Sequence, residues 1–325
     1  MHVLITGAAG MIGRKLIERL VRDGRIGEKA VVQLTLQDIV EPSKPAGVRF
    51  AVTTRAGDLS VPGEAAALVA DAPDVIFHLA AVVSGEAEAD FEKGYRVNLD
   101  GTRLLLEAVR MRKYNPRVIY ASSAAVFGAP FPEAIPDDFH LTPLTSYGTA
   151  KAIGELLLSD YTRRGFLDGI GLRFPTVCVR PGKPNKATSG FFSGIIREPL
   201  AGEDAVLPVP DTTRHTHASP RAAVNFLVHA ALLDGAAVGP RRNLTMPGVS
   251  VTVAGQIEAL RKIAGDTVVS RIKRKPDATV ARIVGSWPER FDTRRARELG
   301  FVAETDFAEI IHIHIEDELQ GKIAN

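Results

Sequence analysis

A tyrosine and a lysine, Tyr147 and Lys151, stand four residues apart in a stretch that the sequence predicts to be helical. Residues at this spacing are neighbours on one face of a helix. A tyrosine hydroxyl in isolation titrates near pH ~10 and is a poor base, but a nearby ammonium stabilises the phenolate and lowers its pKa. The pair therefore predicts a tyrosine that accepts the proton of a substrate alcohol, although such a pair by itself is also common on protein surfaces.

Two further polar residues fit this chemistry. Ser123 follows the apolar run 117–121, which is typical of a buried strand, and its hydroxyl could hold the substrate oxygen. Asn98 lies one predicted helix earlier and could position a water that relays the proton outward. Ser122 precedes Ser123 directly and competes with it for the same role.

The amino-terminal segment predicts a dinucleotide site. A short apolar run, Val3 to Ile5, is followed by glycines and then by apolar residues at helical spacing from Met11 and Ile12 onward. Gly7 permits a tight turn, Gly10 lets the backbone approach a pyrophosphate, and Gly13 lets the helix pack closely on the strand. The free N–H groups at the start of the helix would face the phosphates.

Acidic residues after the next two strands could bind the adenosine half. Asp38 lies where an acidic side chain grips the ribose hydroxyls, which favours NAD over NADP, although Arg14 leaves NADP open. Its alternative is a solvated strand end. Asp58, followed by Leu59, could meet the adenine amino group or simply form a turn.

The element pattern predicts a doubly wound parallel α/β sheet, because strands alternate with helices. Strands are expected at 3–5, 31–36, 49–52, 74–81, 117–121 and 171–174. Helices are expected at 11–21, at 87–112 and after Ser146, which is expected to cap its helix. The fourth strand ends in Leu79, Ala80 and Ala81, and its small side chains leave room for a ligand; His78 beside them is interpreted as a core residue.

The division expected is a dinucleotide-binding domain over 1–175 and a smaller C-terminal α/β substrate lobe over 176–325. A segment near 215–245, with a helix at 222–233, is expected to return to the main sheet, and helices are expected at 249–264 and 303–319.

The composition restricts the partners and the compartment. A net charge of +2 in 325 residues gives no reason to expect nucleic acid, and the apolar runs are too short to span a membrane. One cysteine and no room for a signal peptide before the first strand favour the cytoplasm. No metal is expected, because the histidines at 215, 217, 312 and 314 lack a matching ligand set.

Taken together, these motifs resemble the extended short-chain dehydrogenase/reductase superfamily, which includes NDP-sugar epimerases and dehydratases. The resemblance covers nearly the whole chain. It implies a Rossmann fold, bound NAD, and Ser123 rather than Ser122 as the catalytic serine beside Tyr147 and Lys151. It also implies that Pro175, Thr176 and Val177 contact the cofactor, and that the protein is a homodimer paired through its two long helices.

Two segments indicate the branch of the superfamily. Epimerases carry two aspartates in a segment that corresponds to 214–221 here, and both are missing. The segment 173–200 instead resembles the D-erythronate dehydrogenase group, which oxidises the C2 hydroxyl of a four-carbon sugar acid with NAD.

The side chains of that segment suit a small carboxylate. Arg180, Lys183, Asn185 and Lys186 provide cations and an amide, although each could also belong to a solvated basic loop. Ser84 could touch substrate hydroxyls. An NDP-sugar epimerase or dehydratase with tightly bound NAD, a hexuronate dehydrogenase and a non-catalytic dinucleotide sensor remain the alternatives.

Overall fold

The structure is a computed structural model that describes residues 1–182 and 188–324. Its largest element is a seven-stranded sheet in which all neighbouring strands run parallel. Across the sheet the strands are β12 (Asn243–Thr245), β8 (Asp168–Phe174), β7 (Arg117–Ser123), β6 (Val75–His78), β1 (His2–Thr6), β4 (Gln33–Asp38) and β5 (Ala51–Ala56). The strand order reverses between β1 and β6, where the carboxyl ends of the strands leave a crevice for a ligand.

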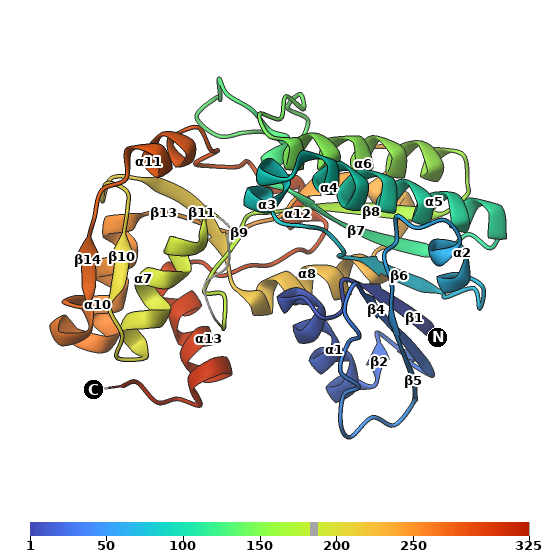
Figure 1. Cartoon of the computed structure of the whole chain (residues 1–325), viewed down its shortest axis with the longest axis horizontal. Helices are drawn as coiled ribbons and strands as arrows, with labels where there is room; N and C mark the ends of the chain where they lie inside the picture. Colours follow the sequence, from blue (N-terminus) through green and yellow to red (C-terminus); the bar gives the residue numbers. More distant parts are fainter. Residues whose placement is uncertain (183–187, 325) are drawn as a thin grey trace.

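Helices cover both faces of this sheet (Figure 1). On one face lie α1 (Met11–Asp23) and α8 (Pro220–Leu232), and on the other lie α2 (Glu64–Leu68), α5 (Gly101–Arg112) and α6 (Ser146–Arg163). Helix α1 buries Leu16, Ile17 and Leu20, which recur at helical spacing, against the sheet. The doubly wound Rossmann architecture is therefore confirmed.

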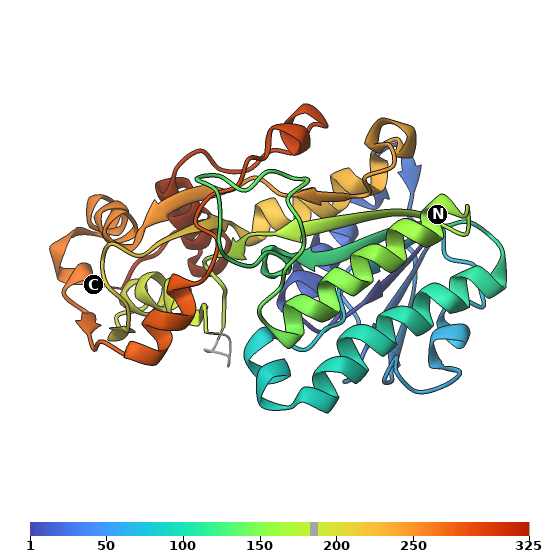
Figure 2. The same cartoon turned by 90° about the horizontal axis from the view of Figure 1, so that it is seen from above.

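A second, smaller lobe has sheets and a core of its own (Figure 2). Its strands are β9 (Thr176–Val177), β11 (Arg214–Ala218) and β13 (Val249–Thr252) in one sheet, and β10 (Ala205–Leu207) with β14 (Ile272–Arg274) in another. Its helices are α7 (Gly190–Leu200), α10 (Val253–Val269), α11 (Ala278–Gly285) and α13 (Phe307–Leu319). Only Pro175 separates β8 from β9, so the chain passes from one sheet to the other at the carboxyl edge of the main sheet.

Short elements complete the described chain: β2 (Arg25–Ile26), β3 (Lys29–Ala30), α3 (Ser84–Ala89), α4 (Phe91–Tyr95), a π-helical turn η1 (Arg96–Asp100), a 3₁₀ turn η2 (Ala124–Val126), α9 (Gly235–Val238) and α12 (Arg294–Glu298). In the segment 215–245, α8 and β12 join the main sheet, whereas β11 belongs to the second lobe.

Three expectations about elements are corrected. The single helix expected over 87–112 is divided into α3, α4, η1 and α5, because Asp90 leaves the helical conformation and caps α4 through the N–H of Lys93. The cap of α6 is Thr145, whose side chain accepts from the N–H of Gly148, so Ser146 is the first helical residue. The helix expected from residue 249 begins at Val253, because 249–252 pair with β11 as strand β13.

No helix in the described part of the chain is both long enough and apolar enough to span a bilayer.

Candidate active site

The glycine turn between β1 and α1 has the close backbone approaches that a pyrophosphate cradle requires. Gly7 has a positive φ of 74°, and a Cβ atom there would lie 2.6 Å from the backbone nitrogen of Ala80. A Cβ atom on Gly13 would lie 2.3 Å from the carbonyl oxygen of Gly7. Met11 and Ile12 form the first turn of α1, so their N–H groups open toward the turn. This turn fits the phosphates of a dinucleotide, because any side chain at Gly7 or Gly13 would collide with the backbone and push the strand, the turn and the helix start apart.

Asp38 lies at the end of β4, beside the glycine turn. Its Oδ2 atom accepts from the N–H of Ala9 at 2.9 Å, and its Oδ1 atom accepts from the N–H of Ile39 at 2.7 Å. The carboxylate is therefore oriented next to the cradle, where a ribose is expected. Arg14, the residue that left NADP open, is exposed on α1.

Asp58 forms a turn, which was the alternative to a contact with adenine. Its Oδ1 atom accepts from the N–H and the hydroxyl of Ser60, and its Oδ2 atom is paired with Arg96. The side chain of Leu59 is buried between α2 and α5. A contact of Asp58 or Leu59 with adenine stays a prediction.

Asn98 fixes the loop that follows β6. It is 1 % exposed within the π-helical turn, and its amide exchanges two hydrogen bonds with the backbone of Val82, at 2.9 and 3.2 Å. The loop that begins with Leu79, Ala80 and Ala81 is thus held over the crevice. π-Helical turns often occur at functional sites. A water relay through Asn98 stays a prediction.

His78 lies in the core, as the sequence predicted. Its ring nitrogens hydrogen-bond the hydroxyls of Thr6 and Thr102, at 2.7 and 2.9 Å, and burial lowers its pKa to about 3. A neutral imidazole with a hydrogen bond at each ring nitrogen holds β1, β6 and α5 together.

The structure brings Ser123, Tyr147 and Lys151 together where β7 ends against the first turns of α6. The hydroxyl of Ser123 lies against the Tyr147 phenol and lowers its pKa. The Oγ atom of Ser123 accepts from the N–H of Ala125 at 3.1 Å. The Lys151 Nζ atom lies 5.8 Å from the centre of the Tyr147 ring and donates to the carbonyl oxygen of Ala121 at 2.7 Å. A strand end, a helix start and one ammonium therefore surround the phenol.

Burial raises the pKa of the Tyr147 phenol, whereas the hydrogen bond from Ser123 and the positive charge of Arg180 lower it. The sequence predicted that Lys151 would be the cation that makes this phenol acidic. In the protein without ligands, the cation that lowers the pKa of Tyr147 is Arg180. Lys151 is itself perturbed, because desolvation lowers the pKa of its amine to about 8.

Arg180 lies just beyond β9 and faces this group. Its Nε atom donates to the carbonyl oxygen of Val177 and its Nη2 atom to Oγ of Ser189, each at 3.1 Å. Among the described residues no carboxylate forms an ion pair with it. Lys183, Asn185 and Lys186 lie outside the described residues, and Ser84 is the first residue of α3, a helix whose Glu88 accepts from the N–H of Ser146.

The predicted cofactor residues Pro175, Thr176 and Val177 lie beside two buried histidines. The Nδ1 atom of His215 faces the carbonyl oxygen of Pro288 at 3.1 Å and must donate to it. Its Nε2 atom therefore accepts from the Thr176 hydroxyl at 2.7 Å. Burial lowers the pKa of His215 to about 4 and the pKa of His217 further, so both rings are neutral.

Nothing in the described part of the chain groups three potential metal ligands of the His, Cys, Asp or Glu type. Cys178, which follows β9, is fully buried, and burial raises the pKa of its thiol to about 12.

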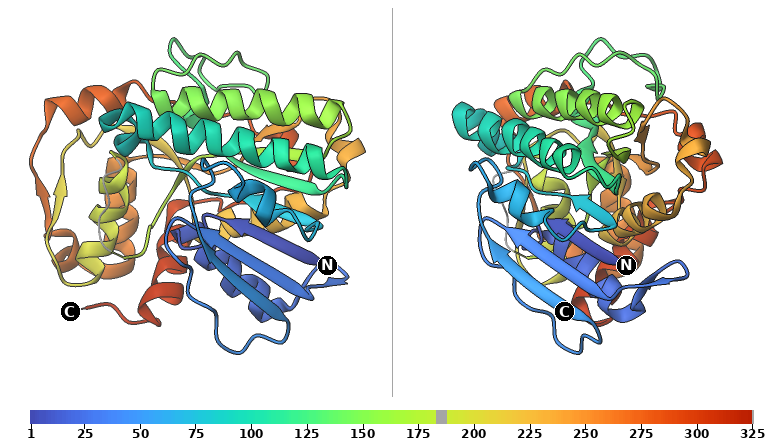
Figure 3. Two further views of the ribbon diagram at one scale, coloured as in Figure 1. Left: turned by 45° about the vertical axis from the view of Figure 1, so that its right-hand side comes forward. Right: turned by 90° about the vertical axis from the view of Figure 1, so that its right-hand side faces the viewer.

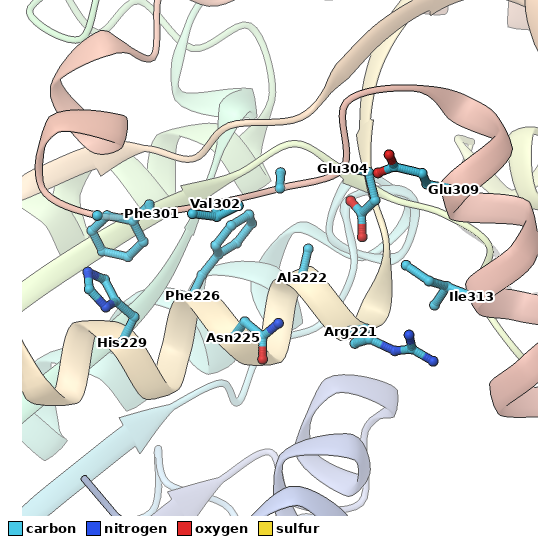
Figure 4. A pocket seen from close by; sticks show the side chains of 12 residues that line it. Arg221, Ala222, Asn225, Phe226, His229, Phe301, Val302, Glu304, Glu309 and Ile313 are labelled. Carbon is cyan, nitrogen blue, oxygen red and sulfur yellow. The ribbon is translucent and has the colours of Figure 1, made fainter.

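A cavity of about 380 Å³ lies apart from these residues, between α8, α13 and the segment 300–304 (Figure 4). The polar side chains Glu304 and Arg221 in its lining already have partners within the protein. Glu304 binds the N-cap Ser219, and Arg221 pairs with Glu316 and Asp317.

Sequence reasoning missed the buried carboxylate of Glu155, which pairs with Arg173 one turn of α6 beyond Lys151. The signal for it was a single acid in an otherwise apolar run, one helical turn after Lys151.

Residues 3–228 match the NAD-dependent epimerase/dehydratase family. The chain belongs to this family. Its membership confirms the predicted resemblance to the extended short-chain dehydrogenases, and NAD is its cofactor.

Two relatives in the family are similar over almost their whole length. A protein of Cupriavidus necator named D-erythronate dehydrogenase is 49 % identical over 98 % of this chain and 98 % of its own. A D-erythronate dehydrogenase of Haemophilus influenzae is 40 % identical over 98 % of this chain and 100 % of its own. They place the chain among the NAD-dependent oxidoreductases of the family.

Two solved structures share the fold of this chain. A protein of Agrobacterium tumefaciens described as a nucleoside-diphosphate-sugar epimerase has a TM-score of 0.98, is 62 % identical, and covers 100 % of this chain and 96 % of its own. The holo form of an L-threonine dehydrogenase from Cupriavidus necator has a TM-score of 0.84 and covers 98 % of this chain and 99 % of its own, and at 22 % identity it shows the fold alone.

Proposed function

We propose that the protein oxidises the C2 hydroxyl of a small sugar acid with NAD, and that D-erythronate, which becomes 2-dehydro-D-erythronate, is its substrate. The observation that carries this proposal is the position of Arg180. Its charge reaches Tyr147, and no described carboxylate neutralises it.

A guanidinium in this position is suited to a carboxylate ligand. Burial lowers the pKa of Arg180, which means that its charge is poorly solvated. The bonds to Val177 and Ser189 orient the guanidinium without neutralising it, because both partners are uncharged. A substrate carboxylate would supply the missing charge through two parallel hydrogen bonds, and this grip would hold the neighbouring C2 hydroxyl toward Tyr147.

The chain's own residues then divide the chemistry. Ser123 holds the substrate oxygen, Tyr147 accepts its proton, and the Lys151 ammonium stabilises the phenolate that results. NAD, when bound, accepts the hydride from the same carbon. Asn98 completes the catalytic set by holding the loop over the crevice and relaying the proton.

The residues proposed to hold NAD surround the crevice at the switch point of the sheet. They are Gly7, Gly10, Met11, Ile12, Gly13, Asp38, Asp58, Leu59, Leu79, Ala80, Ala81, Asn98, Tyr147, Lys151, Pro175, Thr176 and Val177. The residues proposed to bind substrate are Ser84, Ser123, Tyr147, Arg180, Lys183 and Asn185.

The names of the relatives support this substrate, because two proteins named D-erythronate dehydrogenase align with almost the whole chain. The description of the Agrobacterium structure favours a second candidate, an NDP-sugar epimerase, in which NAD is regenerated in every turnover. A hexuronate dehydrogenase would share both the catalytic residues and the carboxylate grip.

A panel of four- to six-carbon sugar acids, assayed with NAD for the formation of reduced nicotinamide, separates these candidates. We expect D-erythronate to give the highest kcat/KM. Conversion of an NDP-sugar without net formation of reduced nicotinamide would contradict the proposal, and a preference for a hexuronate would correct the substrate.

We further propose a homodimer that pairs through α5 and α6. The two helices lie side by side on one face of the molecule (Figure 3), and they carry the exposed apolar residues Met111 and Leu156, which are 63 and 64 % exposed. Leu156→Glu should turn the dimer into a monomer in sedimentation or light scattering, whereas Val302→Glu, a change at an equally exposed residue of the other face, should not. A monomeric wild-type protein would contradict this proposal.

A further inference from the structure

Glu155 is a fully buried carboxylate one turn of α6 beyond Lys151. The hydroxyl of Ser122 donates to its Oε1 atom at 2.5 Å. Arg173 donates to both carboxylate oxygens, with its Nε atom at 2.9 and 3.1 Å and its Nη2 atom at 2.7 Å. Ser122 belongs to β7 and Arg173 to β8, so one carboxylate ties α6 to the carboxyl ends of two neighbouring strands.

Lys151 makes a parallel connection from the same helix. Its Nζ atom donates to the carbonyl oxygen of Ala121 at 2.7 Å, and Glu155 accepts from the next residue, Ser122. Two consecutive turns of α6 therefore hold the two residues that come directly before Ser123. Tyr147, on the preceding turn, lies against Ser123 itself.

The helix approaches β7 closely at this point because of Gly154. A Cβ atom on Gly154 would lie 2.3 Å from the hydroxyl oxygen of Tyr120, which precedes Ala121 in β7. The ring of Tyr120 in turn faces the ammonium of Lys151, with 4.8 Å between the ring centre and Nζ. The cation thus has two aromatic rings, those of Tyr120 and Tyr147, one carbonyl and, one turn away, one carboxylate around it.

These charges act on one another in a dry environment. Desolvation lowers the pKa of Lys151 to about 8, and the negative charge of Glu155 opposes that decrease. Arg173 faces Glu155 from β8, and Asp137 lies 3.9 Å from Arg173 on its other side. Tyr120 is the remaining titratable group against Glu155, and burial raises the pKa of its phenol far above the usual range, so it stays neutral.

We propose that Glu155, held by Arg173, is a positioning residue for the reaction: it fixes Ser123 against Tyr147 and keeps the Lys151 amine in its cationic form. This inference rests on the catalytic roles in the proposed function, but its electrostatic part concerns the chain alone. A merely structural ion pair would hold the strands together whichever way its charges pointed. A positioning pair must present its negative end to Lys151.

The direct test is a titration of the Lys151 amine by NMR, in protein with isotope-labelled lysine side chains. Lys151→Met assigns the signal by its disappearance. We expect the wild-type amine to titrate near pH 8. The amine of Glu155→Gln should titrate about one pH unit lower, because the variant removes the opposite charge that favours the cation.

Two matched variants separate charge from packing. Ser122→Ala removes one hydrogen bond from the same carboxylate without removing its charge, so we expect the Lys151 titration to stay unchanged. The double variant Glu155→Gln with Arg173→Met removes both charges, and a neutral buried pair is tolerated better than a broken one. Its Lys151 pKa should lie between those of the wild type and the single variant.

The order of the three pKa values decides the proposal. A Glu155→Gln titration equal to the wild type, or a double variant that titrates below the single one, would overturn it. If Glu155→Gln does not fold, a double variant that titrates at or above the wild-type pKa overturns it. In the assay with sugar acids, the alkaline limb of kcat should move to lower pH in Glu155→Gln while KM for NAD changes little. A chain that oxidises none of the acids would refute the proposed substrate and leave the titration as an independent test.

Discussion

Lys151 lies closer to the ring of Tyr120 than to the ring of Tyr147, with its Nζ atom 4.8 Å from the first ring centre and 5.8 Å from the second. The ammonium is therefore shared between a structural aromatic residue and the proposed proton acceptor. Because burial raises the pKa of Tyr147, this phenol becomes a base only when the charges around it favour the phenolate.

Replacing Tyr147 should abolish proton transfer without disturbing the cofactor cradle. We expect Tyr147→Phe to lower kcat by roughly 100-fold or more, a typical contribution of general base catalysis, with the Kd for NAD almost unchanged. Steady-state kinetics and a binding titration measure the two effects. Tyr161→Phe, near the other end of α6, removes only a hydrogen bond to Glu107 and should keep full activity. Full activity in Tyr147→Phe would refute the role.

Arg180 should act on the acid and not on the cofactor. We expect Arg180→Ala to raise KM for the sugar acid about 100-fold, because a charge-assisted hydrogen-bond pair is lost, while KM for NAD changes little. Arg180→Lys keeps the charge but not the planar fork and should lie in between. Arg163→Ala, at an exposed ion pair of α6, is the matched control. Equal increases in both KM values would argue against a carboxylate grip.

Asp38 should discriminate between the two nicotinamide dinucleotides. We expect Asp38→Asn to weaken NAD binding about 10-fold and to narrow the gap between NAD and NADP, because the carboxylate that repels a ribose phosphate is gone. Calorimetric titration with each dinucleotide measures this, with the exposed Asp160→Asn as control. Asp38 is no ribose ligand if both affinities stay at their wild-type values.

The buried histidines should make the fold sensitive to acid. His78, His215 and His314 have pKa values lowered to about 3, 4 and 4, against 6.5 when unfolded. The unfolded chain therefore binds more protons than the folded one as pH falls below 6.5, and stability decreases in that direction.

Each of these histidines should lower the free energy of unfolding by about 1.4 kcal/mol per pH unit, from about pH 6 down to its folded-state pKa. Urea unfolding at several pH values measures the slope. His78→Gln should reduce the slope by one histidine's share, and the exposed His140→Gln should not change it. A slope that His78→Gln leaves intact would show that this ring is charged in the fold.

The parts predictable from the sequence are those that local spacing determines. The strand, glycine turn and helix of residues 2–23 form a contiguous unit, and so do Tyr147 and Lys151 on one helix face. The structure places Ser123 beside them because parallel strands end at a common edge. The family match confirms the cofactor that these motifs indicated.

What could not be predicted depends on pairings between residues distant in sequence. Glu155 contacts Arg173 and Ser122 only after α6, β7 and β8 have packed together. Asp58 pairs with Arg96, which lies 38 residues further along the chain. The helix expected over 87–112 is interrupted because Asp90 caps α4. The apolar residues keep their helical spacing on both sides of Asp90, so their pattern did not indicate the interruption. Strand β12 is too short to produce a pattern of its own.

The buried state of Cys178 has a practical consequence for measuring motion. The chain has one cysteine, and its thiol is inaccessible and, with a pKa near 12, almost wholly protonated at neutral pH. If one cysteine were engineered at the surface of each lobe, these two thiols would therefore be the only ones that a maleimide dye labels. Fluorescence transfer between two such dyes could then follow how the lobes move as the dinucleotide and the acid bind, with the native thiol left in place.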